Sequence, residues 1–393
     1  MNPPRVLLVT RRFWPLTGGA ETHVTSLAAE LQRIEVAPTI LTARWQSDWP
    51  PALTHRGVPV TRLINPGAST FGTLRYMLSL GRWLRGQAGA FDLVYVSKLR
   101  HDAYTALTLR SYGDWPVVLR AEGAGPQGDC AWQAKVPFGQ RIARTCHAAE
   151  AIVAPSPLVR DELLAAGYPG EKLHVISSGV AIPSAPVDAA MRQAARADLA
   201  EAHNDFKLPE GARLAVYAGR LRESKGLTTL VAAWRKVVAR HRDARLWLVG
   251  SGPLETELED QIRSAGLTGR VVLTGAFDAV DQVLHAADLF VLPSRHEGLS
   301  LALLEAMAAG LPVVASDIPG NRLAIDSGRH GLLVPTGDAD ALAAGIDELL
   351  SQPEWAATLG AAGRARVSQD FPVGKMVRQH RELFEQLLSK RGG

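Results

Sequence analysis

Cysteine is scarce in this chain, and its apolar runs are interrupted. The two cysteines, Cys130 and Cys146, stand in neither a metal-ligand nor a redox spacing, so the sequence indicates no disulfide framework and no zinc site. The longest apolar run, Leu299 to Ala315, includes a glutamate, a glycine and a proline, which makes it unsuitable as a membrane span. We therefore expect a protein that folds in a reducing compartment.

Neither positive nor negative side chains are in large excess, with 43 lysines and arginines against 39 aspartates and glutamates. The formal net charge is +4 and the pI is about 9.2, which is too mild for a dedicated nucleic-acid binder but suits anionic small molecules or an anionic membrane surface. Residues 3–10 offer an apolar stretch far shorter than the core of a secretion signal. Apolar residues make up 47% and charged residues 21%, as in average globular proteins, so we expect a soluble cytoplasmic enzyme with no nucleic-acid partner.

A chain of 393 residues favours two domains, each large enough for its own core. Short apolar runs alternate with helical patterns throughout, which predicts α/β domains with doubly wound, Rossmann-like parallel sheets. The expected strands are 6–10, 39–42, 93–96, 117–119, 151–154 and 175–176 in the first half, and 214–218, 246–250, 271–274, 289–292, 313–315 and 332–334 in the second.

The domain boundaries follow from where strand signals stop. Residues 184–211 hold no strand pattern and are rich in alanine and charge, so we place a linker there, between a first domain at 1–183 and a second at 212–370. Residues 371–393 contain a helix with one apolar stripe, which needs a surface to cover. Ligands of doubly wound sheets lie beyond the carboxyl ends of the strands, so two facing domains would enclose an interdomain cleft.

The most specific segment is Arg295 to Met307, which follows an expected strand and runs into a helix. It places Glu297 and Glu305 with seven residues between them, a span of roughly 12 Å or less at helical rise, comparable with the distance from hexose to ribose in a sugar nucleotide. Glu305 is the one charged residue between Gly298 and Ser316, so its carboxylate needs hydrogen-bond donors, and vicinal sugar hydroxyls are suitable. The structural alternative is that Glu297 caps the helix and Glu305 pairs with a buried arginine.

Two cations flank a helix start earlier in the same domain. Gly219 and Arg220 follow the strand at 214–218 directly, and Lys225 precedes Gly226 at the start of the next helix. A diphosphate placed there would meet backbone N–H groups and two positive charges, which stabilises a nucleotide leaving group without a metal. Taken singly, each cation could be an ordinary solvated surface charge.

Further motifs are weaker. Gly18 and Gly19 lie between the first strand and the first helix, where backbone could approach a phosphate or sugar, although a plain tight turn reads equally well. Asp338 and Asp340 resemble a metal-binding pair, but they open a helix after Gly337 and are expected to cap it.

Aromatic side chains and one basic helix add two expectations. Six of the nine tryptophans lie in the first half, where some could stack on sugars, although core packing is the ordinary role. The segment from Leu74 to Arg85 combines arginines, Tyr76 and Trp83 with leucines, a composition typical of helices on anionic membranes and also of solvated amphipathic helices.

Together these residues resemble the family 4 retaining glycosyltransferases, whose fold is the two-domain GT-B architecture. The likeness rests on the glycine-pair loop, Gly219 with Arg220, Lys225 with Gly226, the segment 249–253 and the Glu-x7-Glu segment, in the family's order. It implies that the first domain binds the acceptor and that the C-terminal helix crosses back to it. It also implies transfer with retention, without a metal ion or other cofactor, in a front-face displacement.

The resemblance also implies roles for individual residues. Glu297 would contact hydroxyls of the transferred sugar, Glu305 the ribose, and Arg220 with Lys225 the diphosphate. Backbone groups of Gly298, Leu299 and Ser300 would approach the sugar and diphosphate, and the loop at Gly275 would contact the base.

Two positions depart from the family's pattern. Many relatives carry His-Gly after the strand at 117–119, whereas this chain has Glu122 and Gly123, so Glu122 is a candidate catalytic replacement for that histidine. Ser178 stands where many relatives have asparagine, which we expect to affect hinge geometry rather than catalysis.

The functional hypothesis is transfer of a hexose-type unit from a nucleoside diphosphate sugar to a glycan or lipid-linked glycan, with peripheral contact to an anionic membrane. Two alternatives remain at this point: a sugar-nucleotide epimerase or hydrolase of the same architecture, and a non-catalytic nucleotide-sugar-binding protein. Turnover of the donor alone, with no acceptor present, would favour the epimerase or hydrolase. Tight binding of the donor without any product would favour the binding protein.

Overall fold

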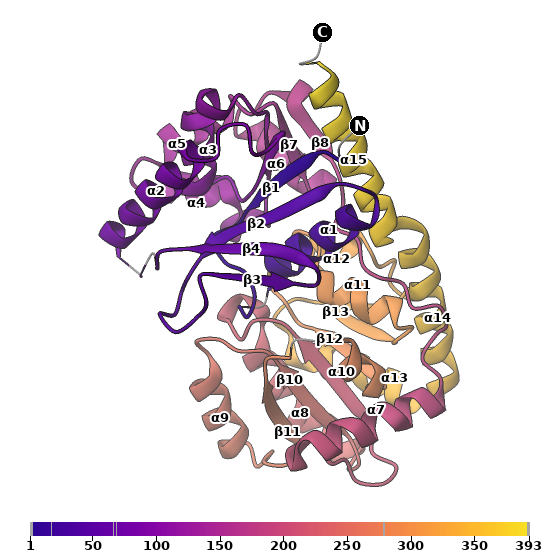
Figure 1. Ribbon diagram of the computed structural model, residues 1–393. Helices are drawn as coiled ribbons and strands as arrows, with labels where there is room; N and C mark the ends of the chain where they lie inside the picture. Colours follow the sequence, from indigo (N-terminus) through magenta and orange to yellow (C-terminus); the bar gives the residue numbers. More distant parts are fainter. Residues whose placement is uncertain (1–2, 17, 66, 68, 278–279, 391–393) are drawn as a thin grey trace. The chain divides into compact units, whose positions relative to one another are not determined.

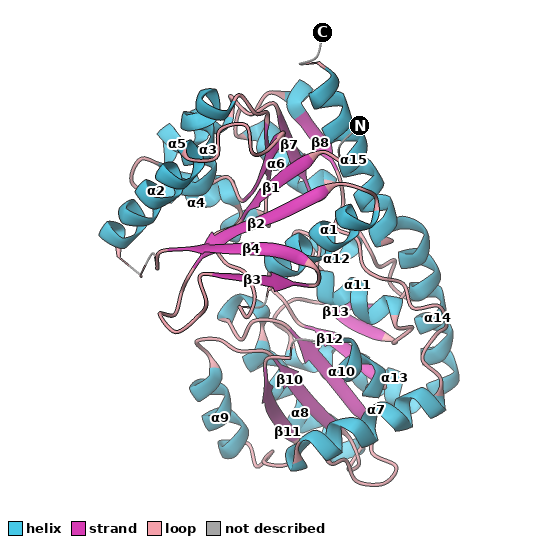
Figure 2. Ribbon diagram, viewed as in Figure 1, coloured by secondary structure: helices cyan, strands magenta, loops and turns pink. Residues whose placement is uncertain are grey.

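The computed structural model describes residues 3–16, 18–65, 67, 69–277 and 280–390. The chain divides into two compact units, 1–179 with 373–393 and 180–372. Figure 1 labels the elements along the chain, and Figure 2 shows that helices and parallel strands alternate in both units. Among the described residues, no helix combines the length and the apolar character that crossing a membrane requires.

The first unit contains an eight-stranded sheet in the order β3-β4-β2-β1-β5-β6-β7-β8. Its strands are Arg5–Val9 (β1), Ala37–Ala43 (β2), Ala52–His55 (β3), Val58–Leu63 (β4), Leu93–Ser97 (β5), Val117–Arg120 (β6), Ala151–Ala154 (β7) and Leu173–Val175 (β8). Its helices are Gly19–Arg33 (α1), Thr70–Arg85 (α2), His101–Gly113 (α3), Asp129–Lys135 (α4), Gly139–Cys146 (α5), Pro157–Ala165 (α6) and Val373–Ser389 (α15).

Both faces of this sheet are covered, as the near-continuous apolar strands require. Successive residues of a strand point to opposite faces, so Val6 and Leu8 of β1 join one buried cluster with α1 and α15, whereas Leu7 and Val9 join the other with α2 to α6. Within the sheet, β2 lies next to β1 on one side, and β5, which comes later in the chain, lies next to β1 on the other side.

The strands β3 and β4 were both missed by the sequence prediction, and β3 makes the sheet mixed rather than wholly parallel. It pairs antiparallel with β4 at the sheet edge, through a two-residue turn in which Arg56 and Gly57 both have positive φ, 50° and 83°. Such a turn matches the right-handed twist of a hairpin. Prolines before β3 and within β4 dilute the apolar pattern, which is tolerated because this pair lies at an edge.

The C-terminal helix α15 belongs to the first unit. Its stripe of Met376, Val377, Leu383 and Phe384 is buried in the same cluster as β1 and α1. Full burial of one such side chain contributes about 1.5–3 kcal/mol, so this helix is an integral layer of the first unit.

The second unit contains a six-stranded parallel sheet in the order β11-β10-β9-β12-β13-β14. Its strands are Leu214–Ala218 (β9), Arg245–Val249 (β10), Val271–Gly275 (β11), Leu289–Leu292 (β12), Val313–Ser316 (β13) and Leu332–Val334 (β14). Its helices are Ala189–Ala202 (α7), Leu227–Arg240 (α8), Glu255–Ser264 (α9), Val280–Ala286 (α10), Leu301–Ala308 (α11), Pro319–Arg322 (α12), Ala339–Ser351 (α13) and Pro353–Asp370 (α14).

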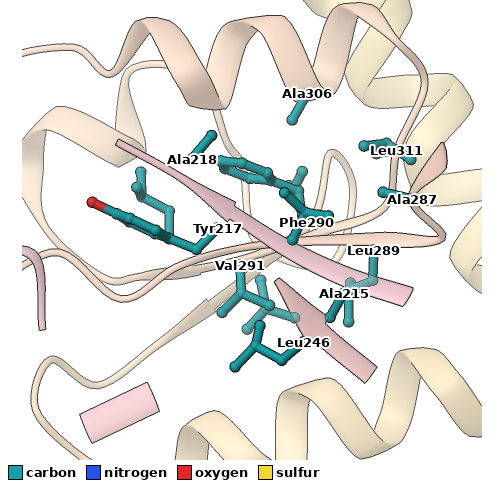
Figure 3. Close-up of a cluster of buried hydrophobic side chains, with 14 of the residues drawn as sticks. Ala215, Tyr217, Ala218, Leu246, Ala287, Leu289, Phe290, Val291, Ala306 and Leu311 are labelled. Carbon is teal, nitrogen blue, oxygen red and sulfur yellow. The ribbon is translucent and has the colours of Figure 1, made fainter. Parts of the chain in front are cut away.

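The core of this unit forms where β9 and β12 lie side by side. Figure 3 shows Phe290 and Leu289 of β12 packed with Ala215 of β9, and Ala306 of α11 lies in the same cluster. All four are buried, because the central strands of a doubly wound sheet have helices on both faces. The prediction of two Rossmann-like doubly wound domains is therefore confirmed.

The segment 184–211, expected as a linker, differs from that expectation because half of it folds as α7 within the second unit. Asp188 caps the helix by accepting a hydrogen bond from Met191 N at 2.7 Å. Arg196 holds it with an ion pair to Asp288 at 2.6 Å, and Leu199 is its one buried side chain. A helix fixed by arginines rather than by an apolar face leaves little periodic signal in the sequence.

Candidate active site

The second unit places its candidate site at the reversal of its strand order. The chain passes from β9 to β10 on one side of the sheet and later returns to β12 on the other side of β9. The loops after β9 and β12 therefore diverge, and this switch point is where open α/β sheets bind ligands. The predicted donor residues Arg220, Lys225 and Glu297 lie in these two loops.

The loops after β9 and β10 approach closely because glycines stand where a side chain would collide with the neighbouring loop. A Cβ on Gly250 would lie 1.9 Å from the carbonyl oxygen of Gly219, and a Cβ on Gly252 would lie 2.3 Å from that of Leu221. Gly219 is exposed and its N–H donates to Val249 O at 2.9 Å. The carbonyl oxygen of Arg220 accepts the Tyr217 hydroxyl at 2.9 Å, which fixes the backbone just after β9.

The loop after β9 is also fixed against the loop after β12. Gly226 caps α8 in the left-handed region with φ 66°, and a Cβ there would lie 2.1 Å from Pro293 O. The N–H of Arg295 donates to Ser224 O at 2.8 Å. These contacts bring Lys225 beside the start of the Glu-x7-Glu segment.

Lys225 and Glu297 form an ion pair, with Nζ 2.6 Å from Oε1. Their side chains are 24% and 11% exposed, so the pair is partly shielded from water and stronger than a surface pair. Burial and the nearby Glu297 charge raise the pKa of Tyr217 well above its ordinary value, which keeps this hydroxyl a neutral donor. Close packing continues on the far side, where a Cβ on Gly320 would lie 2.2 Å from Glu297 O.

Glu297 does not cap the following helix, so that part of the structural alternative is wrong. The cap of α11 is Ser300, whose hydroxyl accepts from Leu303 N at 3.4 Å. Residues 297–300 precede the helix, so the estimate of the carboxylate separation from helical rise does not hold for them. Glu305 is half-buried in the middle of α11.

Four further predicted positions lie in this unit at the ends of strands or before α11. Gly298 and Ser300 are buried and Leu299 is half-buried, between the Lys225–Glu297 pair and the first turn of α11. Gly275 ends β11 with φ 74°, and its carbonyl oxygen accepts from Gly250 N at 2.8 Å. Among the described residues outside its chain neighbours, no heavy atom lies within 4 Å of a Cβ built on Gly275.

Comparison with known proteins agrees with this geometry. Residues 17–182 match the family model described as Glycosyltransferase Family 4, and residues 212–352 match the model described as Glycosyl transferases group 1. The chain is 29% identical to the alpha-maltose-1-phosphate synthase of Mycolicibacterium smegmatis, over 98% of this chain and 99% of that protein. This chain belongs to the family 4 glycosyltransferases.

Solved structures show the same GT-B fold. Sucrose-phosphate synthase from Thermosynechococcus elongatus superposes with a TM-score of 0.80 at 23% identity, covering 98% of this chain and all of that one. Anabaena HepE, solved with UDP and glucose, superposes with a TM-score of 0.78 at 20% identity and similar coverage. As a family 4 enzyme, the chain is a retaining glycosyltransferase that uses a nucleoside diphosphate sugar, and a hexosyltransferase by class.

In the first unit of this glycosyltransferase, Glu122 follows β6 and forms an ion pair with a buried arginine. The guanidinium of Arg120, which is 1% exposed, forms an ion pair with the Glu122 carboxylate and donates to Ser178 Oγ at 2.7 Å. Ser97 Oγ lies 3.4 Å from the same carboxylate, and Glu122 N donates to Asp129 at 2.9 Å. Glu122 is thus the counterion of Arg120, a role that the sequence did not suggest.

The glycine pair lies where it was predicted, at the start of α1. Gly18 precedes the helix and Gly19 is its first residue, with open space around a Cβ built on Gly19. The expected cap at Asp338 is confirmed, because its carboxylate accepts from Asp340 N and Ala341 N at 2.8 and 3.0 Å.

The basic segment that was predicted to contact membranes is α2, but its exposed apolar side chains differ from the expected set. Tyr76, Leu80 and Leu84 are buried. The exposed apolar residues are Phe71, Leu74 and Leu78, at 74%, 53% and 67% exposure. They lie on one face because they are spaced three and four residues apart.

Sequence analysis did not single out the residues that follow β5. Lys98 and Arg100 come directly after this strand, and Asp102 is buried in the first turn of α3. The signal was available, because they occupy the same position after a strand as the candidate residues of the second unit.

Proposed function

We propose that this glycosyltransferase moves a hexose from a nucleoside diphosphate sugar to a glycan or lipid-linked glycan, with retention and without a metal ion. The observation that carries the proposal is the Lys225–Glu297 ion pair at the β9/β12 switch point. Glu297 would accept hydrogen bonds from sugar hydroxyls, and Lys225 with Arg220 would bind the diphosphate. Gly298, Leu299 and Ser300 would present backbone groups to the same ligand, and Gly275 would lie beside the base.

The chemistry follows from charge. Breaking the bond between the anomeric carbon and the diphosphate oxygen leaves an added negative charge on the diphosphate, so cations fixed beside it stabilise the transition state more than the ground state. The acceptor oxygen forms the new bond, and its proton passes to the departing phosphate oxygen. Lys225 is held by Glu297 before any ligand arrives, so little reorganisation is needed.

The experiment that tests the proposal is a screen of uridine, guanosine and adenosine diphosphate sugars by thermal shift and turnover, followed by linkage analysis of products. UDP-glucose is the first probe, because HepE was solved with it. An acceptor-dependent glycoside with retained configuration supports the proposal. Donor consumption without an acceptor would instead indicate a hydrolase or epimerase, and binding without any product a nucleotide-sugar-binding protein.

Glu305 provides a first prediction on donor binding. We expect Glu305→Gln to weaken binding of the nucleoside diphosphate by about tenfold, because a charge-assisted hydrogen bond to the ribose contributes about 1.5–3 kcal/mol. Isothermal titration measures the dissociation constant. Glu348→Gln, an exposed position on α13, is the matched control, and equal affinities in the two variants would contradict the assignment.

The α2 face provides a second prediction, which concerns the membrane. This helix contains no acidic residue, and Arg75, Arg82 and Arg85 are exposed on it. Such a face suits an anionic bilayer, where apolar side chains enter the interface and arginines meet the headgroups. We expect co-sedimentation with vesicles that contain phosphatidylglycerol, and weaker binding to them at high salt.

The variant with Phe71, Leu74 and Leu78 all changed to Gln should bind these vesicles at least about tenfold less tightly, since it loses most of the buried apolar area. Leu164→Gln is the control, because Leu164 is also exposed, at 44%, but lies on α6. Sedimentation that is independent of lipid charge, or unchanged in the triple variant, would remove the membrane from the proposal.

A further inference from the structure

The first unit has its own switch point, between β1 and β5. The chain leaves β1 toward β2 on one side and reaches β5 on the other, so the loops after β1 and β5 diverge. Arg11 and Arg12 follow β1, and Lys98 and Arg100 follow β5. Cations therefore gather at the carboxyl edge where a doubly wound sheet takes its ligand.

An aromatic ring lies among these cations. Trp45 follows β2, and the guanidinium carbons of Arg11 and Arg12 each lie 5.9 Å from its ring centre. Trp45 Nε1 donates to Arg11 O at 2.8 Å, and Arg11 Nη2 donates to Thr73 Oγ1 at 2.8 Å. Hydrogen bonds thus fix both the indole and the guanidinium of Arg11 before any ligand binds.

Two carboxylates of this edge pair with Arg100 and Arg12 rather than with Arg11 or Lys98. Asp129 pairs with Arg100 at 2.8 Å, and Glu21 lies 3.7 Å from Arg12. Asp102 is buried near the same cations: burial raises its pKa to about 6, and the charges of Arg11, Lys98 and Arg100 act in the opposite direction with smaller effect. Within the described part of the chain, no carboxylate lies at ion-pair distance from Arg11 or Lys98.

A buried donor adds to this evidence. Arg11 Nε is inaccessible to water and has no hydrogen-bond partner among the described residues. Because leaving a buried donor unsatisfied is costly, such a group is usually completed by a ligand or by water. The chemistry that satisfies guanidinium and ammonium groups together is a phosphate or carboxylate.

We propose that Arg11 and Lys98 form an anion subsite for the acceptor, so that the acceptor is a sugar that carries a phosphate or carboxylate, with its ring against Trp45. This inference rests on the proposed function, because it takes the first unit as the acceptor-binding unit. The recognised chemistry is the anionic group, and its source is either a free sugar acid or phosphate or the phosphate of a lipid-linked sugar.

The first experiment measures binding without turnover. The full-length protein is titrated calorimetrically with a hexose phosphate, a hexuronic acid and the matching neutral hexose. We expect the anionic ligands to bind at least about tenfold more tightly than the neutral hexose. Arg11→Gln and Lys98→Gln should each remove about tenfold of that affinity, since each deletes one charge-assisted contact.

Controls separate binding from folding. Arg33→Gln removes an arginine of the same unit whose side chain is 74% exposed at the other end of α1, and it should leave anion affinity unchanged. Arg11→Lys keeps the charge and should retain more affinity than Arg11→Gln. Thermal unfolding midpoints of all variants identify any that fail to fold, and Lys98→Gln tests the subsite if Arg11→Gln is one of them.

The outcomes distinguish this inference from the proposed function. Transfer to a free sugar phosphate, a sugar acid or a phosphate-linked lipid sugar, at least tenfold faster than to neutral sugars, supports the subsite and identifies the source. The subsite is overturned if neutral acceptors are used as fast as anionic ones, or if Arg11→Gln and Lys98→Gln both keep the wild-type affinity for anions. Neither result affects the assignment of donor binding. Failure of the wild-type protein to bind any sugar nucleotide would overturn the proposed function, and the anion titration remains readable.

Discussion

Replacing Arg220 by alanine is expected to lower the turnover number about 10²- to 10³-fold while changing donor affinity much less. The reason is that the diphosphate gains negative charge as the glycosidic bond breaks, so a cation beside it acts mainly in the transition state. Its backbone is fixed by the Tyr217 hydroxyl, so the loop should keep its course in the variant. Steady-state kinetics at saturating acceptor, with calorimetric titration of donor, separate the two effects.

The matched control for this prediction is Arg235→Ala, an exposed arginine on α8 in the same unit. It removes the same charge from the chain without touching the loop after β9. Arg220→Lys should recover part of the lost rate, because it restores a positive charge without the planar fork of the guanidinium. Wild-type kinetics in Arg220→Ala would end the assignment of this residue to the leaving group.

The second large effect is on stability, at Glu122. We expect Glu122→Gln to lower the free energy of unfolding by about 3–5 kcal/mol, because it leaves the Arg120 guanidinium buried without its counterion. Urea unfolding followed by tryptophan fluorescence measures the change. A catalytic role of Glu122 as a replacement for the family's histidine would instead lower turnover in a protein of unchanged stability.

A double variant distinguishes these readings of Glu122. Arg120→Met combined with Glu122→Leu removes both charges, and it should be less destabilised than Glu122→Gln alone, since no unpaired charge stays buried. If the double variant is the less stable of the two, the Arg120–Glu122 pair is not what holds this part of the first unit.

Much of the fold could be predicted because it depends on local patterns. Buried strands such as β9 and β12 are short apolar runs, and their alternation with amphipathic helices specifies a parallel sheet in each half. The elements that escaped prediction lack such patterns. Prolines precede the edge strand β3 and lie within its partner β4. The helix α7 is held by an ion pair between Arg196 and Asp288, which are far apart in the sequence.

The sequence by itself determined at which edge of the second sheet the candidate residues lie, because Arg220, Lys225 and Glu297 each follow a strand, and strand ends converge at one edge of a parallel sheet. Only the tertiary structure decided how they are used: that Lys225 pairs with Glu297, that Ser300 rather than Glu297 caps α11, and that Glu122 neutralises Arg120. The reason is that chain order fixes the edge on which a side chain lies. Its partner depends on packing between segments far apart in the sequence, as with the glycines that let the loops after β9 and β10 come together.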